Sequence, residues 1–260
     1  MSSSNIYIIT HKPFEVRYPN NYIPLQVGKK FTKNELPYLS DDTLDNISDK
    51  NKNFCELTGV YWIWKNAEMP KYIGITHYRR FFVKNGNLLT DKDISKFMEK
   101  YDVILPKQFY FSDTVWNNYF KNGEGKEKDL IALKSIINSN YKEYSDAFNK
   151  VMYSNSASYC NMFIMKKDDF YQYCQWLFGI LFELEKKTDI SEYTASEARI
   201  YGYLSELLLN VWIEKEKLNV KYCKMKKIDS SFKRNIKWNL KMLKGYIYGK
   251  FRKLKNMEEK

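Results

Sequence analysis

The 260-residue sequence contains four cysteines, two histidines and none of the common nucleotide-binding glycine motifs, and these absences exclude several classes of protein. The cysteines stand far apart and form no CxxC pair, so we interpret them as buried thiols in a reducing compartment, not as disulfides or zinc ligands. Neither a GxxxxGKS/T loop nor a GxGxxG turn occurs, which disfavours NTPases and hydride-transfer enzymes. GxSxG and HExxH motifs are also missing.

Long apolar segments are missing as well. The longest wholly apolar run in the aromatic-rich region extends only from Trp176 to Phe182, whereas a helix that spans a bilayer needs about 20 residues. The first five residues lack the charged and apolar regions of a secretory signal. We therefore expect a cytoplasmic protein.

Positive charge is in excess, with 43 Lys and Arg against 31 Asp and Glu, but the excess is unevenly distributed. Residues 221–260 hold 14 basic and 3 acidic residues, whereas residues 1–220 hold 29 and 28. We therefore expect a nearly neutral domain over residues 1–220 and a basic tail over residues 221–260. A high pI is also typical of nucleic-acid-binding proteins, but no RRM, KH or helix-turn-helix signature occurs, so we expect no nucleic-acid partner.

The basic tail has a helical pattern over residues 232–255. On a helical wheel its apolar residues share one side, its Lys and Arg residues occupy the adjoining side, and aromatic residues flank the apolar stripe. This pattern predicts a basic amphipathic helix that lies in the plane of an anionic membrane surface. The alternative is a terminal helix that packs on the domain and leaves its basic face in water.

Short β-branched and aromatic runs alternate with helical patterns through the first 220 residues. This alternation predicts an α/β fold with a mostly parallel sheet, and such sheets bind ligands at the carboxyl ends of their strands. The intervening segments 16–52 and 107–127 are expected to be loops. We expect strands at 5–10, 72–76, 102–106 and 161–165, and helices at 54–66, 91–100, 128–150, 168–184 and 196–214.

Both histidines follow expected strands, since His11 comes after residues 5–10 and His77 after residues 72–76. In a parallel sheet they would lie on the same rim, together with Lys12 and the arginines at 79 and 80. Arginine offers a planar fork to phosphate oxygens and lysine a point charge, so this rim suits a diphosphate. The alternative is structural: the histidines cap their strands, and the arginines pair with carboxylates of the preceding 41–49 loop.

Several segments together resemble a bacterial family of capsular and exopolysaccharide glycosyltransferases. That family was catalogued as a domain of unknown function, and some of its members are assigned as galactofuranosyltransferases. The resemblance covers roughly residues 5–215, and the strand that ends in His-Tyr-Arg-Arg is its most specific element. The matching segments are Asp45–Ser48, Phe54–Thr58, Tyr61–Asn66, Tyr72–Arg80, Asn161–Met165 and Tyr173–Phe178.

The resemblance implies a GT-A-like fold and transfer of a hexose, galactofuranose among the candidates, by a glycosyltransferase domain over residues 1–220. It also implies a nucleotide-sugar donor, with UDP the expected nucleotide, and a glycan or lipid-linked glycan acceptor at the inner face of the cell membrane. The Asp-x-Asp that commonly clamps metal and diphosphate in such enzymes is missing at the expected strand end, where His77–Arg80 stands instead. We therefore predict no metal ligands and expect Arg79 and Arg80 to replace the metal, with Mn²⁺ or Mg²⁺ as the open alternative.

Transfer requires donor contacts and, if the sugar inverts, a base that takes the acceptor proton. The base candidates are Asp129, after the long 107–127 loop, and Glu206, which shares a helical stripe with Arg199. Capping of a helix by Asp129, and plain solvation of the other two charges, are the alternatives. The predicted donor and diphosphate contacts are His11, Lys12, Asp45, Asn46, Tyr78, Arg79, Arg80 and Arg199.

Three further residues complete the predicted site. His77 is a third catalytic candidate, and Trp116 and Asn161 are predicted on the acceptor side. Glu56 is a lone carboxylate among apolar helix residues; it is either part of the chemistry or a hydrogen-bond partner of the 76–80 segment. The functional alternatives are a basic nucleic-acid-binding protein and a catalytically inactive sugar-binding homologue.

Overall fold

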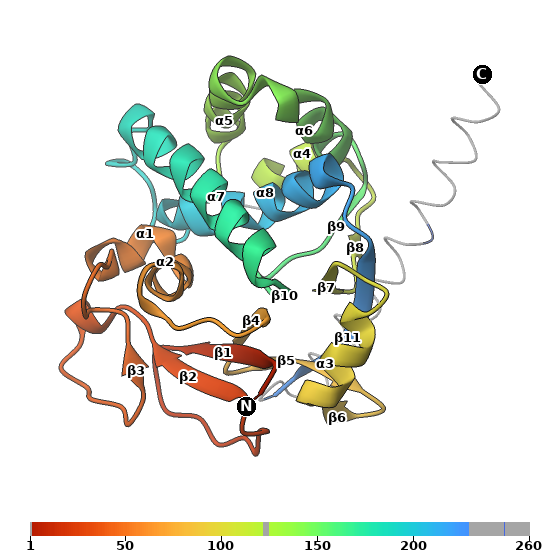
Figure 1. Cartoon of the computed structure of the whole chain (residues 1–260). Coiled ribbons are helices and arrows are strands. Elements are labelled where there is room, and N and C mark those ends of the chain that lie inside the picture. The colour runs from red at the N-terminus through yellow and green to blue at the C-terminus, as the bar shows by residue number, and fades with distance from the viewer. Residues whose placement is uncertain (1, 122–124, 229–246, 248–260) are drawn as a thin grey trace.

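A nine-stranded sheet lies at the centre of the structure, a computed structural model that describes residues 2–121, 125–228 and 247 (Figure 1). The strand order is β3-β2-β1-β4-β10-β7-β11-β5-β6. A separate hairpin joins β8 (Phe109–Tyr110) to β9 (Ser156–Ala157). The strands of the sheet are β1 (Ser4–Thr10), β2 (Tyr22–Gln26), β3 (Leu39–Ser40), β4 (Tyr72–His77), β5 (Arg80–Lys84), β6 (Asn87–Leu88), β7 (Val103–Pro106), β10 (Phe163–Lys166) and β11 (Val220–Lys227).

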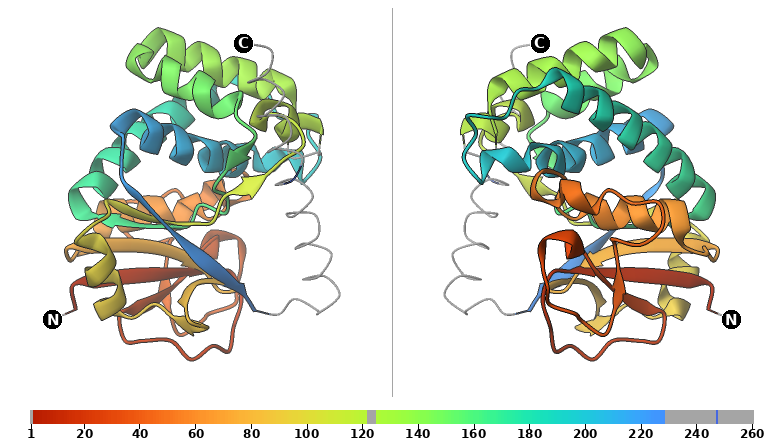
Figure 2. Two further views of the ribbon diagram at one scale, coloured as in Figure 1. Left: turned by 90° about the vertical axis from the view of Figure 1, so that its right-hand side faces the viewer. Right: turned by 90° about the vertical axis from the view of Figure 1, so that its left-hand side faces the viewer.

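Most of the helices cover one face of the sheet, whereas α3 packs against the other (Figure 2). Strand β1 is therefore buried on both faces: Ile6 and Ile8 enter the core on the α3 side, and Tyr7 and Ile9 enter the larger core. The helices are α1 (Asn51–Phe54), α2 (Leu57–Asn66), α3 (Asp91–Met98), α4 (Val115–Lys121), α5 (Glu127–Asn140), α6 (Ser145–Met152), α7 (Lys167–Lys187) and α8 (Ile200–Glu216).

The predicted α/β class is confirmed, but the sheet is mixed and not mostly parallel. Strand β1 runs parallel to β2 and β4, whereas β10 runs antiparallel to both β4 and β7. Hydrophobic periodicity carries no information on strand direction, so the sequence could not reveal this reversal. Its consequence is that the beginning of β10 lies at the same edge as the carboxyl ends of β1 and β4.

Several expected elements are divided or were missed. The helix expected at 54–66 is broken into α1 and α2, and the helix expected at 128–150 is divided into α5 and α6. The expected loop 107–127 contains β8 and α4, and strand β2 lies inside the expected loop 16–52. Strand β2 was missed because it contains Pro24, which is rare inside strands. The proline is tolerated because only Leu25 and Gln26 of β2 pair with the short neighbour β3.

The domain boundary expected after residue 220 falls inside the sheet. Strand β11 pairs in parallel with β7 and antiparallel with β5, so its four lysines belong to the globular domain and not to a tail. The amphipathic helix expected at 232–255 lies outside the described residues. Within the described ranges no helix combines the length and the apolar character that a membrane crossing requires.

Candidate active site

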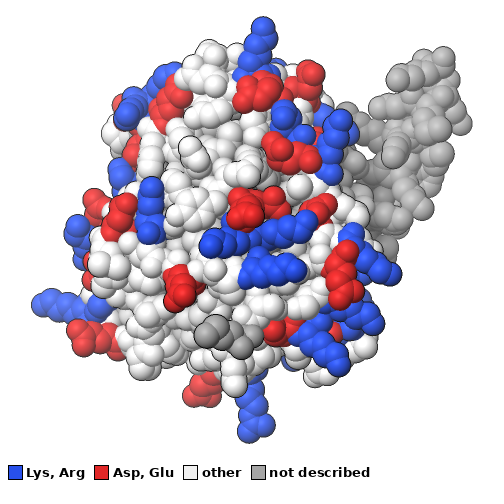
Figure 3. All heavy atoms as spheres, viewed as in Figure 1, with Lys and Arg blue, Asp and Glu red and all other residues white. Residues whose placement is uncertain are grey.

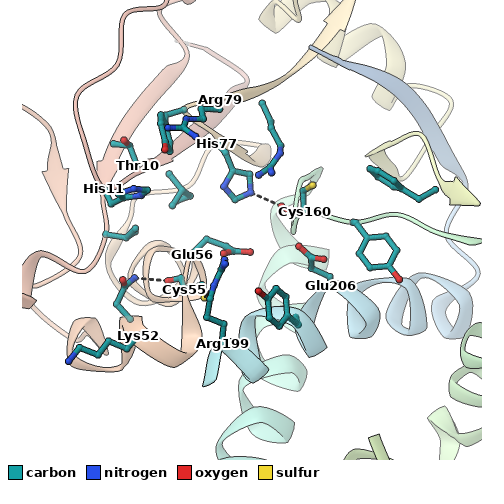
Figure 4. Close-up of a pocket in the computed structure, with 18 of the residues that line it drawn as sticks. Thr10, His11, Lys52, Cys55, Glu56, His77, Arg79, Cys160, Arg199 and Glu206 are labelled. Atoms are coloured by element: carbon teal, nitrogen blue, oxygen red, sulfur yellow. Dashed lines mark hydrogen bonds between the residues drawn. The ribbon is translucent and has the colours of Figure 1, made fainter. Parts of the chain in front are cut away.

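A cavity of about 660 Å³ opens at the carboxyl ends of β1 and β4, where the sequence predicts a site (Figure 4). His11, one residue after β1, and His77, the last residue of β4, both line it, so the prediction of a shared rim is confirmed. Tyr78 and Arg79 follow in a tight turn, which the Thr76 hydroxyl closes by donating to the carbonyl oxygen of residue 80. The rim is thus built by two parallel strands and one turn.

The cavity is predominantly positive. Its charged lining consists of four cations and two carboxylates: Lys52, Arg79, Arg80, Arg199, Glu56 and Glu206. Burial, together with the positive charges of Lys12 and two nearby arginines, lowers the pKa of His11. His11 is therefore neutral at pH 7, and it packs edge-to-face on Tyr78 with ring centroids 5.3 Å apart. This end of the cavity suits an anion.

His77 is held as a neutral imidazole. Its Nε2 lies 2.5 Å from the carbonyl oxygen of Cys160, and since a carbonyl only accepts, Nε2 carries the hydrogen. Burial chiefly lowers the pKa of His77, so Nδ1 is unprotonated at neutral pH. The ring therefore contributes a fixed hydrogen-bonding group to the site and no positive charge.

A strained backbone segment before β10, which we call the strained corner, connects His77 to the rest of the site. Cys160 and Asn161 have φ angles of 78° and 45°, a left-handed conformation that costs a non-glycine residue about 1–2 kcal/mol. The first residue presents its carbonyl to His77. The second turns its side chain inward, where Nδ2 lies 2.6 Å from Oε1 of Glu56 and 2.8 Å from Oγ of Ser205.

Asn161 is not the acceptor contact that the sequence predicts. Its side chain is only 2% exposed and lies behind the cavity wall. It was misplaced because its position depends on the reversed direction of β10, which brings residue 161 against α2 and α8. Asn161 therefore contacts the site through its hydrogen bond to Glu56 and does not face the cavity itself.

Glu56 enters the cavity because the chain is kinked between α1 and α2. Cys55, at the kink, has φ 53° and ψ −128°, a conformation that a regular helix excludes. The carboxylate stands at the N-cap of α2, where the helix dipole favours negative charge. The continuous helix predicted over 54–66 concealed this arrangement.

The beginning of α8 supplies the opposite wall. The Arg199 Nε donates to the Cys55 sulfur at 3.2 Å, and the guanidinium lies 5.1 Å from the centre of the Tyr203 ring. Glu206 lies on the same side of this helix and lines the cavity. The structure thus brings together the two residues that the sequence places on one helical stripe.

Asp129 is a structural residue, and its prediction as a base is wrong. Its side chain is fully buried and does not line the cavity. The carboxylate accepts from the backbone N–H of Lys126 at 2.8 Å, from the hydroxyl of Tyr119 at 3.2 Å and from the hydroxyl of Tyr193 at 2.5 Å. The capping alternative is therefore the correct one.

Two further predicted donor contacts close a loop outside the cavity. Asp45 accepts a hydrogen bond from the Tyr61 hydroxyl at 3.1 Å. Asn46 donates from Nδ2 to the carbonyl oxygen of Leu44 at 2.9 Å. The structure places their polar groups in the loop before α1 and outside this cavity, so contact with the donor stays a prediction.

Lys12 and Trp116 also lie outside the cavity lining. The Lys12 ammonium lies 5.5 Å from the centre of the Tyr78 ring, so its charge adds to the rim without lining it. The Trp116 indole N–H donates to Glu127 at 2.9 Å, and the ring stacks on Tyr153. Trp116 was predicted on the acceptor side because it lies in an aromatic-rich segment, but that segment folds into α4.

Sequence reasoning missed an aromatic wall and a polar wall of the cavity. The aromatic wall is made by Phe109, Tyr110, Phe111, Tyr159 and Tyr203, and the polar wall by Asn51 and Lys52. Phe109, Tyr110 and Phe111 lie in the aromatic-bearing 107–127 segment, which gave a sequence signal. Tyr159, Tyr203 and the residues of the polar wall come from distant parts of the chain.

Within the described part of the chain, no group of three or more His, Cys, Asp and Glu is arranged to hold a metal ion. The two cavity carboxylates come from different helices and are accompanied by three arginines. The donor set present is therefore that of an anion site.

Two comparisons with known proteins bear on this site. The sequence model of a domain of unknown function (DUF4422) matches residues 5–217. A solved structure described as the apo form of the bifunctional glycosyltransferase WbbM is similar in fold, with a TM-score of 0.82 and 32% sequence identity. The similarity covers 88% of this chain but 46% of that one, so the chain spans less than half the length of WbbM. No curated protein matches the chain significantly in sequence.

Proposed function

We propose that this chain, which belongs to the DUF4422 family, is a glycosyltransferase that moves a hexose from a nucleotide-sugar donor to a glycan acceptor. The observation that carries the proposal is the cluster of Arg79, Arg80 and Arg199 in a cavity at the carboxyl ends of two parallel strands. The similarity in fold to a bifunctional glycosyltransferase supports it.

The arginine cluster suits the diphosphate of the donor. A departing nucleoside diphosphate gains negative charge as the bond to the sugar breaks, and guanidinium groups fixed beforehand stabilise that charge. Arginine binds such oxygens through two parallel N–H groups, without a metal ion. We therefore expect EDTA to leave transfer intact; loss of transfer that Mn²⁺ or Mg²⁺ restores would contradict this assignment.

The two remaining walls suit the other parts of the substrates. The polar wall, with Asn51 and Lys52 beside His11, is assigned to the nucleotide, which we propose is UDP. The aromatic wall is assigned to sugar rings, because tyrosine and phenylalanine offer flat apolar faces together with polar edges. Galactofuranose is a candidate for the sugar that is transferred.

For the acceptor we propose a capsular or exopolysaccharide chain or its lipid-linked precursor. The basic and apolar residues at helical spacing in 232–255 support a position at the anionic inner face of the cell membrane. Deletion of residues 232–260 should release the protein from anionic vesicles and preserve transfer to a soluble acceptor. A truncated protein that still sediments with these vesicles would contradict the membrane part of the proposal.

The proposal is tested with a panel of nucleotide sugars, measured for binding by calorimetry and for transfer or slow hydrolysis. We expect one member to bind and turn over, and Arg79→Ala or Arg80→Ala to abolish turnover in a folded protein. Lys92→Ala, an exposed cation of α3, is the matched control and should behave as wild type. Near-normal turnover in both arginine variants would refute the diphosphate clamp, and binding without turnover by the wild-type protein would indicate a sugar-binding homologue.

A further inference from the structure

We propose that Glu56 is the catalytic base of the transfer reaction and that Asn161 and Ser205 are positioning residues that aim its carboxylate. The inference rests on the proposed function, which it deepens by assigning the proton acceptor. It replaces Asp129, which is buried outside the cavity, and it selects between the two carboxylates that line the cavity.

Glu56 occupies the position that a base requires. Figure 4 shows its side chain and that of Arg199 extending toward the same space, with His77 and Arg79 across from them. With the diphosphate bound by Arg79 across the cavity, the sugar carbon attached to it would lie between Arg79 and this carboxylate, and Arg199 would reach the diphosphate from the Glu56 side. An acceptor hydroxyl that attacks this carbon on the side away from the leaving group passes next to Glu56.

The buried amide of Asn161 fixes the direction of the carboxylate. The Ser205 hydroxyl donates to the carbonyl oxygen of Gly202 at 2.7 Å, so its oxygen is left to accept one N–H of the amide at 2.8 Å. The second N–H of the same amide then points to Glu56 Oε1 at 2.6 Å. Both amide hydrogens are thus used, and the short second contact requires the carboxylate to accept.

The amide nitrogen faces acceptors only: besides Glu56 and Ser205, the carbonyl oxygen of Gly202 lies 3.1 Å from Nδ2. Among the described residues, the amide Oδ1 is a buried oxygen with no hydrogen-bond partner. A rotated amide would place this oxygen against Oε1, where two acceptors repel each other. Presenting the N–H groups to Ser205, Gly202 and Glu56 therefore leaves this oxygen without a partner, and the amide fixes the direction of the Glu56 carboxylate.

Glu56 shares its cavity with charged and titratable groups from several elements. They are His11, Lys52, Cys55, His77, Tyr78, Arg79, Arg80, Tyr110, Tyr159, Cys160, Arg199, Tyr203 and Glu206. Cys55 and Cys160 stay protonated at neutral pH because burial raises their pKa values, to about 11 and about 12. Besides these thiols and the neutral histidines, the cavity lining holds two carboxylates, those of Glu56 and Glu206.

The step is a single displacement. The acceptor oxygen forms a bond to the anomeric carbon while the bond from that carbon to the diphosphate oxygen breaks, and the electron pair leaves with the diphosphate. The acceptor proton moves to Glu56, and the developing charge on the diphosphate is met by the arginines. The configuration at the anomeric carbon is inverted.

The test separates this inference from the proposed function by measuring binding and transfer independently. The probes are UDP for binding and the nucleotide sugar that turns over in the panel for transfer. We expect Glu56→Gln to lower kcat at least 100-fold, as loss of a general base does, while the Kd for UDP changes less than about threefold. Glu68→Gln, which alters an exposed glutamate after α2, is the matched control and should retain wild-type kcat.

The positioning residues have a readout that a purely structural role would not produce. Asn161→Asp keeps a residue that tolerates the left-handed backbone but sets a second carboxylate beside Glu56. We expect the acidic limb of the pH–kcat profile to move to higher pH in this variant, and Ser205→Ala to lower kcat more than it raises KM.

Three results would overturn the assignment. They are wild-type kcat in Glu56→Gln, loss of kcat in Glu206→Gln with Glu56→Gln unaffected, and retention of configuration in the product by NMR. A wild-type protein that neither binds UDP nor turns over any donor would instead refute the proposed function itself.

Discussion

Two carboxylates stand at the beginnings of two helices, Asp129 at α5 and Glu56 at α2, and their surroundings differ in one decisive way. Asp129 is fully buried and accepts hydrogen bonds on both oxygens from its own fold. Glu56 is held through Oε1 by one amide and lines a cavity. The comparison teaches that a position at the start of a helix does not by itself decide whether a carboxylate is structural or available to a substrate. The deciding factor is whether all of its oxygens are hydrogen-bonded within the fold or some of them face a cavity.

The largest expected effect comes from removing the buried member of this pair. Asp129→Ala leaves two hydroxyls and one backbone N–H without their acceptor, so we expect the free energy of unfolding to fall by about 3 kcal/mol or more. Glu56→Gln keeps an acceptor toward Asn161 and should lower it by less than about 1 kcal/mol. Urea denaturation followed by circular dichroism measures both; equal losses would erase the distinction.

A smaller effect should follow from loosening Asp129 without removing it. Tyr193→Phe deletes the hydroxyl that donates to this carboxylate at 2.5 Å but preserves the ring beneath Lys126 and Lys128. Because the acceptor is charged, we expect a loss of about 1.5 kcal/mol in the same denaturation experiment. A change near zero would mean that the carboxylate is satisfied by its other two donors alone.

The strained corner offers a third and smaller contrast, on the Glu56 side of the comparison. Asn161→Ala and Asn161→Gly both remove the amide, but only alanine pays for the left-handed φ of 45°. We expect the glycine variant to be more stable by about 0.5 kcal/mol, the left-handed penalty less the entropy of a flexible residue. Both should lose transfer alike; recovery of transfer in the glycine variant would show that the backbone, not the amide, matters.

The smallest expected effect is a pH dependence from His77, which lies beside Glu56. Burial lowers its pKa in the folded state, so below the ordinary histidine value of about 6.5 the unfolded chain binds a proton that the folded chain resists. This contribution to stability is complete above that pH and is lost progressively as pH falls toward the lowered value. His77→Gln should show a shallower decline between pH 7 and 5 in thermal unfolding; an identical decline would contradict the assignment.

The parts of the site that could be predicted depend on neighbours in sequence. His11 and His77 were found because each sits at the end of a short buried run, and parallel strands bring such ends together. Arg199 and Glu206 were found because helical periodicity puts residues seven apart on one face. The capping role of Asp129 was also visible locally, as one of two alternatives.

The remaining parts depend on contacts that no local pattern encodes. Asn161 approaches Glu56 although the two residues are more than 100 positions apart in the sequence. This approach depends on the kink at Cys55 and on the reversed direction of β10. Strand β11 was assigned to the basic tail because it is rich in lysine. Its place in the sheet depends on pairing with β5 and β7, which the local sequence does not reveal. Strand pairing decided these features.

The charge distribution also takes a different meaning once the strand is assigned. Acidic and basic side chains are interspersed on the face seen in Figure 3, as expected for a nearly neutral domain. The cavity differs from that face, because four cations and two carboxylates line it. This arrangement favours a small anionic ligand over a long nucleic acid.

Strand β11 has a mechanical consequence. Its last residue, Lys227, pairs with Arg80, and the backbone N–H of Ile228 donates to the carbonyl oxygen of Arg79 at 2.9 Å. The polypeptide therefore leaves the sheet directly beside the two arginines of the rim. The backbone of Arg79 and Arg80 is therefore anchored to the last described residues of the domain, and a change in the pairing of Lys227 and Ile228 would be transmitted to the cavity rim through these hydrogen bonds.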